Sequence, residues 1–189
     1  MNILVTGGLG YLGSHAVVEL IQQNYGVVIL DNLSNSHKKN LKQIEKITCK
    51  KIKFYKEDIR HKSSLRKIFK DNNIKGIMHF AGLKSVQKSN SHRKEYFDVN
   101  VNGTRNLINV LDEIDNDEKF FIFSSSACVY GNPDYLPYDE THGLQPENFY
   151  GETKLQSEQI LEETYKNFKD WKIVVLRYFN PIGSHHSYL

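Results

Sequence analysis

Cysteine, proline and long apolar runs are scarce in this chain, and their scarcity excludes several classes of protein. The two cysteines, Cys49 and Cys128, lie far apart without the spacing of a metal site, so we expect reduced thiols, no bound metal and a cytoplasmic location. No apolar run approaches the roughly 18 residues that a transmembrane helix needs. No signal-peptide pattern precedes the first apolar segment, and we therefore expect no membrane partner.

A strong excess of one charge is missing as well. Twenty-five basic and 22 acidic side chains give a formal net charge of +3. The lysines lie in short scattered groups, such as 37–39 and 50–53, without interleaved aromatic residues or a nucleic-acid motif. We interpret them as solvated surface rather than a nucleic-acid patch, in a chain whose composition is ordinary for one globular domain.

Strand-length apolar segments alternate with helical patterns along the chain. The strands are predicted at 3–5, 27–31, 52–55, 76–80, 120–124 and 173–177, and the helices at 13–23, 38–47, 63–72, 92–114 and 148–169. Such alternation predicts right-handed crossovers and a parallel sheet covered on both faces. We therefore predict an α/β protein with a doubly wound Rossmann fold, strand order 3-2-1-4-5-6, forming one domain over residues 1–189.

A glycine-rich segment joins the first predicted strand to the first predicted helix. Residues 6–13 read TGGLGYLG, in the context that a dinucleotide-binding fingerprint requires. Glycines there permit a tight turn and bring backbone N–H groups close to a pyrophosphate, which the helix dipole also favours. The second strand ends on Asp31, where a carboxylate accepts the adenosine ribose hydroxyls and repels the extra phosphate of NADP, so NAD is the predicted cofactor.

Tyr150 and Lys154 are four residues apart on a predicted helix and so share one face. A fixed ammonium favours the phenolate, which makes Tyr150 a candidate acid and base near neutral pH. This pattern alone is weak, because both residue types are common on amphipathic helices.

Hydroxyl groups at the end of the fifth predicted strand strengthen that hypothesis. The strand runs into Ser124, Ser125 and Ser126 at its carboxyl end, which faces the ligand crevice in this kind of sheet. The simpler alternative is that the serines only end the strand and cap the next segment. The loop at 131–146 contains proline, glycine and aspartate, and we expect it to frame a substrate entrance.

Several segments match the patterns of one family. They are VTGGLGYLGSH at 5–15, LDNLSNS at 30–36, DIR at 58–60, HFAGLK at 79–84, NVNGT at 100–104, SSSACVYG at 124–131 and LRYFNP at 176–181. Together they resemble the UDP-glucose 4-epimerase family within the extended short-chain dehydrogenase/reductase superfamily. The resemblance covers the whole chain and implies NAD as cofactor and a UDP-sugar as substrate.

The resemblance also implies which residues form the site. At the NAD pyrophosphate it places Gly7, Gly10, Tyr11, Leu12 and Gly13; around the adenosine, Asp31, Asn32, Leu33, Ser34, Asn35, Ser36, Asp58 and Ile59; toward the nicotinamide, Phe80, Ala81, Gly82, Leu83, Lys84, Asn100, Tyr150, Lys154 and Phe179. It places Ser126, Tyr150 and Asn180 at the UDP-sugar. Asp58 as a helix cap, Asn100 as a turn residue and Phe179 as a core residue are the plainer alternatives.

The implied reaction is reversible inversion at C4 of a UDP-hexose. Tyr150 takes the C4 hydroxyl proton while hydride passes to the nicotinamide, and Ser126 hydrogen-bonds the reacting oxygen. Lys154 lowers the pKa of Tyr150 and holds the nicotinamide ribose. The 4-keto sugar then turns over and takes hydride back on its other face, so the nucleotide has to be held firmly and the sugar loosely.

Two other functions compete with this interpretation. Nucleotide-sugar 4,6-dehydratases share the glycines and the Tyr/Lys pair, but their pattern has an Asp-Glu pair after the strand-end hydroxyl, where this chain has Ala127-Cys128. A noncatalytic NAD-binding Rossmann protein would need none of Ser126, Tyr150 and Lys154.

The resembling proteins continue well beyond Leu189 with a portion that supplies most contacts to UDP and the sugar. We therefore expect this chain to be the cofactor half, with little turnover by itself and no information on sugar specificity. The resemblance also implies a homodimer through the helices at 92–114 and 148–169. Apolar residues at helical spacing are the candidate contacts, unless they face the sheet: Leu107, Val110, Leu111, Leu155, Ile160 and Leu161.

Overall fold

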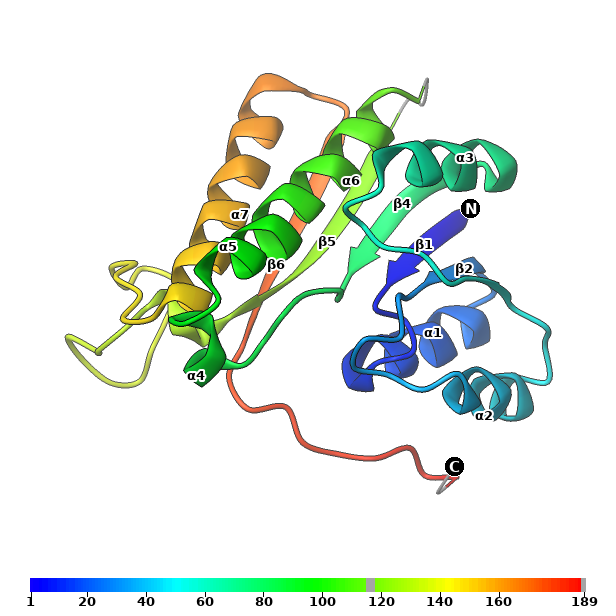
Figure 1. Cartoon of the computed structure of the whole chain (residues 1–189), viewed down its shortest axis with the longest axis horizontal. Helices are drawn as coiled ribbons and strands as arrows, with labels where there is room; N and C mark the ends of the chain where they lie inside the picture. The colour runs from blue at the N-terminus through cyan, green and yellow to red at the C-terminus, as the bar shows by residue number, and fades with distance from the viewer. Residues whose placement is uncertain (115–117, 188–189) are drawn as a thin grey trace.

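A six-stranded parallel sheet forms the centre of the computed structural model, which describes residues 1–114 and 118–187 (Figure 1). The last two residues of the predicted domain, 188 and 189, lie outside the described part. The strands are β1 (Asn2–Thr6), β2 (Gly26–Leu30), β3 (Lys53–Tyr55), β4 (Ile74–His79), β5 (Lys119–Ser126) and β6 (Trp171–Tyr178). Their order is β3-β2-β1-β4-β5-β6, so the predicted Rossmann topology is confirmed.

Helices connect the strands as the alternating pattern predicts. The longer ones are α1 (Tyr11–Gln22), α2 (Lys39–Thr48), α3 (Lys62–Asn72), α6 (Gly103–Asp112) and α7 (Phe149–Asn167). Short elements complete the set: α4 (Val86–Ser89), α5 (Arg93–Tyr96), the π-helix η1 (Phe97–Asn102) and the 3₁₀ turn η2 (Ala127–Val129).

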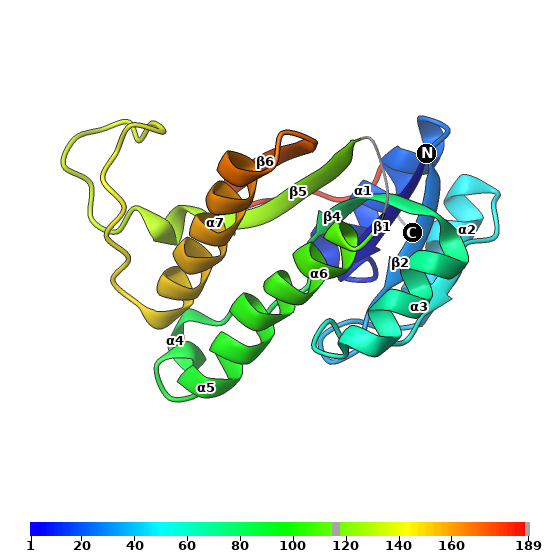
Figure 2. The same cartoon turned by 90° about the horizontal axis from the view of Figure 1, so that it is seen from above.

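Two apolar cores lie on opposite faces of the sheet. Alternate residues of β1, such as Leu4 and Val5, point to different faces. On the Leu4 face the core is closed by α3, α6 and α7, which lie in a row in Figure 2. On the Val5 face it is closed by α1 and α2. These two layers hold the carboxyl ends of the strands in fixed positions.

The expectation of full cover on both faces fails at one edge. Val174, in the middle of β6, has 49% of its surface exposed, because the core under α1 and α2 extends over β3, β2, β1 and β4 but not to β6. On the other face, Ile173 and Val175 of the same strand pack against the core under α6 and α7.

The predicted helix at 92–114 is a succession of three helical segments. α5, η1 and α6 follow one another without a break, and η1 is wound as a π-helix. Within it, the Asn100 side chain bonds both backbone groups of Leu83, in the loop after β4. Helical periodicity alone does not reveal this, because a π-turn inserts one residue into an otherwise regular pattern.

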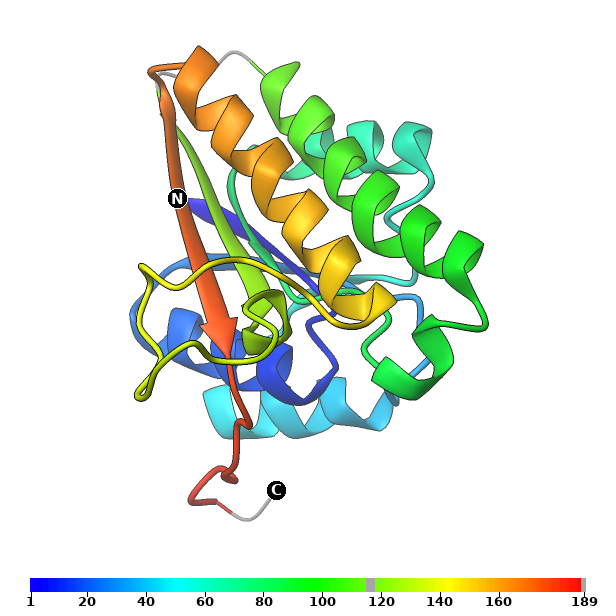
Figure 3. The ribbon, with the colours of Figure 1, turned by 90° about the vertical axis from the view of Figure 1, so that its left-hand side faces the viewer.

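The loop at 131–148 passes between the end of β5 and the start of α7. In Figure 3 this loop, drawn in yellow, arches past the carboxyl end of β6. Tyr138 from this loop lies with its ring 5.6 Å from that of Phe179, which comes directly after β6. The loop therefore borders the crevice side of the sheet, where ligands bind in open α/β folds.

Candidate active site

The glycine turn between β1 and α1 is built by close backbone packing. Gly7 has φ +65°, and a Cβ there would lie 2.7 Å from the backbone nitrogen of Ala81. A Cβ at Gly13 would overlap the carbonyl oxygen of Gly7. Only glycine therefore fits at either position, and the first turn of α1 is pressed against the end of β1.

The N-terminus of α1 is open toward a cavity. Its N-cap, Gly10, makes no side-chain hydrogen bond, and the first turn carries no acidic residue. Gly10, Tyr11, Leu12 and Gly13 all line the cavity. Free N–H groups at the positive end of a helix dipole are suited to a pyrophosphate.

Asp31 lies directly after β2 and ties the neighbouring loops together. Its buried carboxylate accepts hydrogen bonds from the Leu9 and Leu33 backbone nitrogens, at 3.0 and 2.9 Å, and from Ser36 Oγ at 2.7 Å. Asp31 also lines the cavity. A carboxylate has about four acceptor sites, so it retains capacity for one more donor.

Asp58 is the centre of a second hydrogen-bonded group after β3. The guanidinium of Arg60 donates to both carboxylate oxygens at 2.9 Å, and Asn32 donates to one of them. The bonds from Arg60 hold the pKa of Asp58 well below its usual range, more strongly than burial raises it. Asp58 also accepts from the Arg60 backbone N–H, which lies before the start of α3, and the N-cap of that helix is His61, so Asp58 is not its cap.

A cavity of about 760 Å³ extends across the carboxyl ends of the strands, within the range of cofactor and ligand pockets. Nearly all of the predicted site residues line it. They are Gly7, Gly10, Tyr11, Leu12, Gly13, Asp31, Asn32, Ser34, Asn35, Ser36, Asp58, Ile59, Phe80, Ala81, Gly82, Leu83, Lys84, Ser126, Tyr150, Lys154, Phe179 and Asn180.

Leu33 and Asn100 are the predicted residues that do not line this cavity. Leu33 packs against the core under α1, and its backbone N–H is bonded to Asp31. Asn100 is buried, and its side chain bonds the backbone of Leu83 and donates to Thr153 Oγ1 at 3.0 Å. Asn100 therefore lies behind the cavity wall, where its side chain joins the loop after β4 to α7, and it is not part of a turn.

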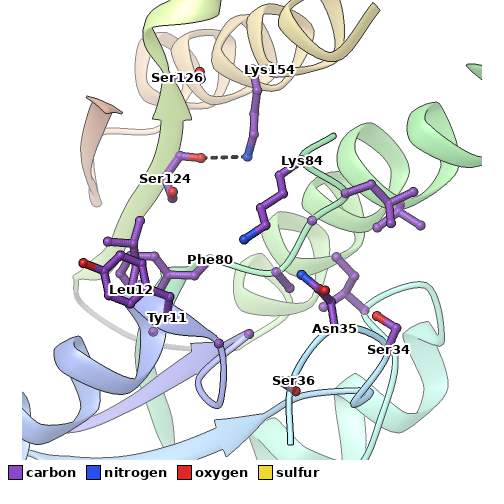
Figure 4. Close-up of a pocket in the computed structure, with 18 of the residues that line it drawn as sticks. Tyr11, Leu12, Ser34, Asn35, Ser36, Phe80, Lys84, Ser124, Ser126 and Lys154 are labelled. Carbon is purple, nitrogen blue, oxygen red and sulfur yellow. Dashed lines mark hydrogen bonds between the residues drawn. The ribbon is translucent and has the colours of Figure 1, made fainter. Parts of the chain in front are cut away.

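Phe179 and Lys84 point into open space on the cavity side. Phe179 is 57% exposed, which rules out the alternative that it is a core residue. Figure 4 shows Lys84 and Lys154 approaching the middle of the cavity from different elements, the loop after β4 and α7. The two side chains bring positive charge to the region between the glycine turn and α7.

Ser126, Tyr150 and Lys154 meet at one end of the cavity, as the sequence predicts. Tyr150 and Lys154 lie on the same face of α7, and the Lys154 Nζ is 5.9 Å from the centre of the Tyr150 ring. Ser126 ends β5 and its hydroxyl accepts from the Cys128 backbone at 3.2 Å. A hydrogen bond with Ser126 lowers the pKa of Tyr150, but burial, the larger effect, raises it above its usual value.

The expected lowering of the Tyr150 pKa by Lys154 is wrong for this structure. The Lys154 ammonium donates to the backbone carbonyl oxygen of Ser124 at 2.7 Å, drawn as the dashed line in Figure 4, rather than to the phenol. Burial lowers the pKa of Lys154 to about 8, against an opposing effect of Glu158. The group is therefore still mostly protonated at neutral pH.

Several lining residues escaped the sequence analysis as site residues. They include Ser124, which holds Lys154 through its main chain, and Glu57, Arg60, Val86, Glu95, Val99, Cys128, Tyr178 and Pro181. Ser124 had a signal, since it opens the serine run. A backbone acceptor carries no side-chain signature, so the role of its carbonyl group is visible only in three dimensions.

Neither a metal site nor a membrane span is found in the part of the chain that the structure describes. No group of three or more His, Cys, Asp or Glu side chains there is arranged to hold a metal ion. No described helix has both the length and the apolar character needed to cross a bilayer.

The fold and the site define a class of protein. A Rossmann sheet, a glycine turn before α1 and a Ser/Tyr/Lys group beside the same cavity are the marks of the short-chain dehydrogenase/reductase type. The cavity also fits a dinucleotide, because the tight turn leaves room for phosphates and Asp31 stands at the end of β2.

Comparison with known proteins narrows the class. The model of the NAD dependent epimerase/dehydratase family matches residues 3–188, and the chain belongs to this family. UDP-glucose 4-epimerase of Dictyostelium discoideum is 46% identical over 186 residues, covering 98% of this chain and 54% of that protein. The enzyme of Pasteurella multocida is 46% identical over 188 residues, covering 99% and 55%. The chain thus spans about half the length of the curated relatives it matches.

Solved structures agree with the sequence relatives. UDP-glucose 4-epimerase of Stenotrophomonas maltophila, determined with NAD and a formylated UDP-arabinopyranose, superimposes with a TM-score of 0.94 at 43% identity, over 99% of this chain and 55% of that one. The Bifidobacterium longum enzyme, determined with NAD⁺ and UDP, gives a TM-score of 0.94 at 41% identity, over 99% and 56%.

Proposed function

We propose that this chain binds NAD and forms the cofactor half of a UDP-hexose 4-epimerase. The observation that carries the proposal is the placement of Ser126, Tyr150 and Lys154 at one end of a cavity whose other side is the glycine turn. A single dinucleotide spanning the cavity would bring its nicotinamide to the Ser/Tyr/Lys group. Family membership and the NAD-bound relatives support the same cofactor.

Each part of the cofactor has candidate residues. The amides of Tyr11, Leu12 and Gly13 would hold the pyrophosphate, and Asp31 the adenosine ribose. Lys154 would hold the nicotinamide ribose, with Phe80 and Lys84 nearby. The bound nicotinamide would supply a hydride acceptor and donor and a positive charge.

The protein's own contribution would be proton transfer. Tyr150 would exchange a proton with the C4 hydroxyl of the sugar, and Ser126 would hydrogen-bond the same oxygen. Because burial raises the pKa of Tyr150 in the free chain, an added positive charge is needed for the phenolate to form near neutral pH. Asn180, exposed at the cavity rim, would contact the UDP-sugar.

Epimerisation is favoured over elimination by the residues directly after β5. Ala127 and Cys128 are the first two residues of η2, immediately beyond Ser126. An alanine has no proton to give, so the acid needed to expel water from C6 is missing at that position. The UDP-glucose 4-epimerase relatives support the same choice.

A chimera tests the function. In it, this chain replaces the matching half of the Pasteurella multocida relative, and conversion of UDP-galactose to UDP-glucose is measured beside the 189-residue chain. We expect turnover by the chimera and little by the chain alone, since remote binding of the nucleotide positions C4. A 4-keto-6-deoxy product would show a dehydratase, and NAD binding without turnover in the chimera would show a noncatalytic role.

We also infer a homodimer and a cytoplasmic location. Two free cysteines, one of them exposed, are compatible with a reducing compartment. The dimer would use the outer faces of α6 and α7, but with different contacts from those first expected. Four of the six predicted contact residues are buried against the sheet: Leu107, Val110, Leu111 and Leu161. Ile160 is half-buried but packs against the same core, which leaves the half-buried Leu155 and the exposed Gln159 on α7.

A further inference from the structure

Glu158 is a buried carboxylate that the proposed chemistry does not use. It lies on α7 one turn after Lys154, and its side chain is 8% exposed. Arg177 of β6 donates to it through Nη2 at 2.7 Å and through Nε at 3.2 Å to both oxygens. Ser125 Oγ donates a further hydrogen bond to Oε1. The carboxylate is thus fully satisfied by two different strands.

Three consecutive residues of β5 contact three successive turns of α7. Ser126 acts on Tyr150 by lowering its pKa, the Ser124 carbonyl group accepts from Lys154, and Ser125 donates to Glu158. Residues four apart on a helix lie on one face, so these contacts form a single seam. Ser125 and Arg177 are direct partners in the β5–β6 register, which places both donors opposite the same carboxylate.

Arg177 is itself held in place from a third direction. Its guanidinium lies 4.9 Å from the ring centre of Tyr130 and donates to the Tyr130 hydroxyl at 3.1 Å. Tyr130 is buried at the start of the loop that precedes α7. Glu158 is therefore fixed to β5, to β6 and, through Arg177, to the chain that leads into α7.

A buried ion pair gives little net stability relative to apolar residues, but an Arg–carboxylate pair with several directed hydrogen bonds is made only in one relative placement of its two partners. Rotation or sliding of α7 by a fraction of a turn would break several directed bonds at Glu158 at once. The same movement would displace Lys154 from the Ser124 carbonyl group and Tyr150 from Ser126.

We propose that Glu158, clamped by Arg177 and Ser125, is a positioning residue that sets the register of α7 on β5 and so places Tyr150 and Lys154 in the site. The inference rests on the proposed function for its consequence, NAD binding and proton transfer. Its structural part, the fixed position of Lys154, is measurable in the chain without any ligand.

The test replaces the pair by apolar residues, Glu158→Met with Arg177→Met, so that no unpaired charge remains to unfold the chain. The matched control is Lys119→Met with Asp170→Met, which removes a 2.7 Å ion pair at the opposite end of β5. The first readout is the titration of the Lys154 Cε resonance in ¹³C-lysine-labelled chain, assigned with Lys154→Met. The second is the Kd for NAD, and the third is the melting temperature.

The direction in which the Lys154 midpoint moves distinguishes a displaced Lys154 from a Lys154 that has only lost a neighbouring charge. The titratable groups that face Lys154 are Tyr150 and Glu158 on α7 and the buried His79 on β4. Of the two charges that the double variant removes, Glu158 is the one that acts on Lys154, so its loss lowers the midpoint of an unmoved Lys154. Release of Lys154 into water raises the midpoint toward the ordinary lysine value of about 10.4.

We expect the double variant to melt near the wild-type temperature, with a raised Lys154 midpoint and at least a tenfold weaker affinity for NAD. The control should change neither the Lys154 midpoint nor the affinity for NAD. A lowered or unchanged midpoint in a folded double variant overturns the proposal. If the wild-type chain fails to bind NAD, the proposed function fails, but the Lys154 midpoint still decides whether Glu158 sets the position. Should the double variant be unfolded, Ser125→Ala gives the same readout, because it removes one bond of the clamp without leaving a charge.

Discussion

The Lys154 ammonium donates to the backbone carbonyl oxygen of Ser124 at 2.7 Å, where the last residues of β5 pass under α7. This bond gives the buried cation a neutral acceptor instead of a carboxylate. The ammonium therefore stays available to a ligand, since lysine has three N–H donors and this contact uses one. It also explains why the phenol of Tyr150 is not paired with the cation in the free chain.

Burial of Lys154 predicts an unusual dependence of stability on pH. The pKa is about 8 in the folded chain against 10.5 ordinarily, so the unfolded chain binds the proton more tightly. Burial of the ammonium thus opposes folding at every pH below 8, and the opposition fades as pH rises from 8 to 10.5. We expect Lys154→Met to raise the free energy of unfolding by up to about 3 kcal/mol at pH 7, and by much less near pH 10.

Urea unfolding at a series of pH values measures this difference. Lys172→Met is the control, because Lys172 is exposed on the edge strand β6. A Lys154→Met effect that is the same at pH 7 and pH 10 would show that the gain comes from packing and not from titration.

Asp31 should make the chain prefer NAD to NADP. A phosphate on the adenosine ribose would meet a buried carboxylate already bonded to Leu9, Leu33 and Ser36, which leaves it little freedom to move away. We expect at least a tenfold tighter Kd for NAD, a difference of about 1.4 kcal/mol or more. Titration calorimetry with both cofactors measures it, and equal or tighter binding of NADP would remove Asp31 from the proposed role.

Asp31→Asn provides the matching variant. The change keeps the size of the side chain but removes its charge, so the Kd values for NAD and NADP should become more similar. Some affinity for both cofactors should be lost too, because an amide oxygen cannot accept all three of the bonds that hold the glycine turn and the loop after β2.

The outer faces of α6 and α7 should pair two copies of the chain. Light scattering over a concentration series is expected to give the mass of two chains. Gln159→Arg would place like charges on facing α7 helices and should shift the mass toward one chain. Val174→Glu is the control on the uncovered face of β6; if it alone dissociates the complex, association runs through the sheet and the helix pairing is wrong.

The fold was predictable from the sequence because strands and helices alternate along the chain. Short apolar strands between helices leave few topologies, and right-handed crossovers select the observed strand order. The sites of Gly7 and Asp31 were equally predictable, since both lie at strand ends in a known context. The burial of Leu107 and Leu161 against the sheet was not predictable. Helical spacing shows that a helix has an apolar face, but not whether that face meets the sheet or another chain.

Side-chain electrostatics escaped prediction for a related reason. The spacing of Tyr150 and Lys154 places them on one face, but the pKa of each depends on burial and on partners from distant strands. Ser124 and Arg177 are contributed by β5 and β6, and nothing in the α7 segment indicates either contact. Local spacing therefore predicted which residues are present in the site, and tertiary packing decides how each group is charged and held.

Tyr150→Phe should nearly abolish epimerisation in the chimera while leaving NAD binding largely intact. The phenol oxygen is the only atom removed, and the ring still packs with Tyr96 and Phe149, so neither the fold nor the glycine turn is disturbed. Loss of a general acid and base lowers rates by about a hundredfold to ten-thousandfold. Tyr165 lies on the same helix and is 60% exposed, so Tyr165→Phe should change neither the rate of epimerisation nor the affinity for NAD. Lys154→Ala should weaken both, because its ammonium is assigned to the nicotinamide ribose, and a nicotinamide that is poorly held supplies neither the hydride acceptor nor the positive charge that the Tyr150 phenolate needs. Paired measurements of kcat and of the Kd for NAD distinguish these patterns, and near-normal turnover by Tyr150→Phe would show that the Tyr/Lys face of α7 is structural.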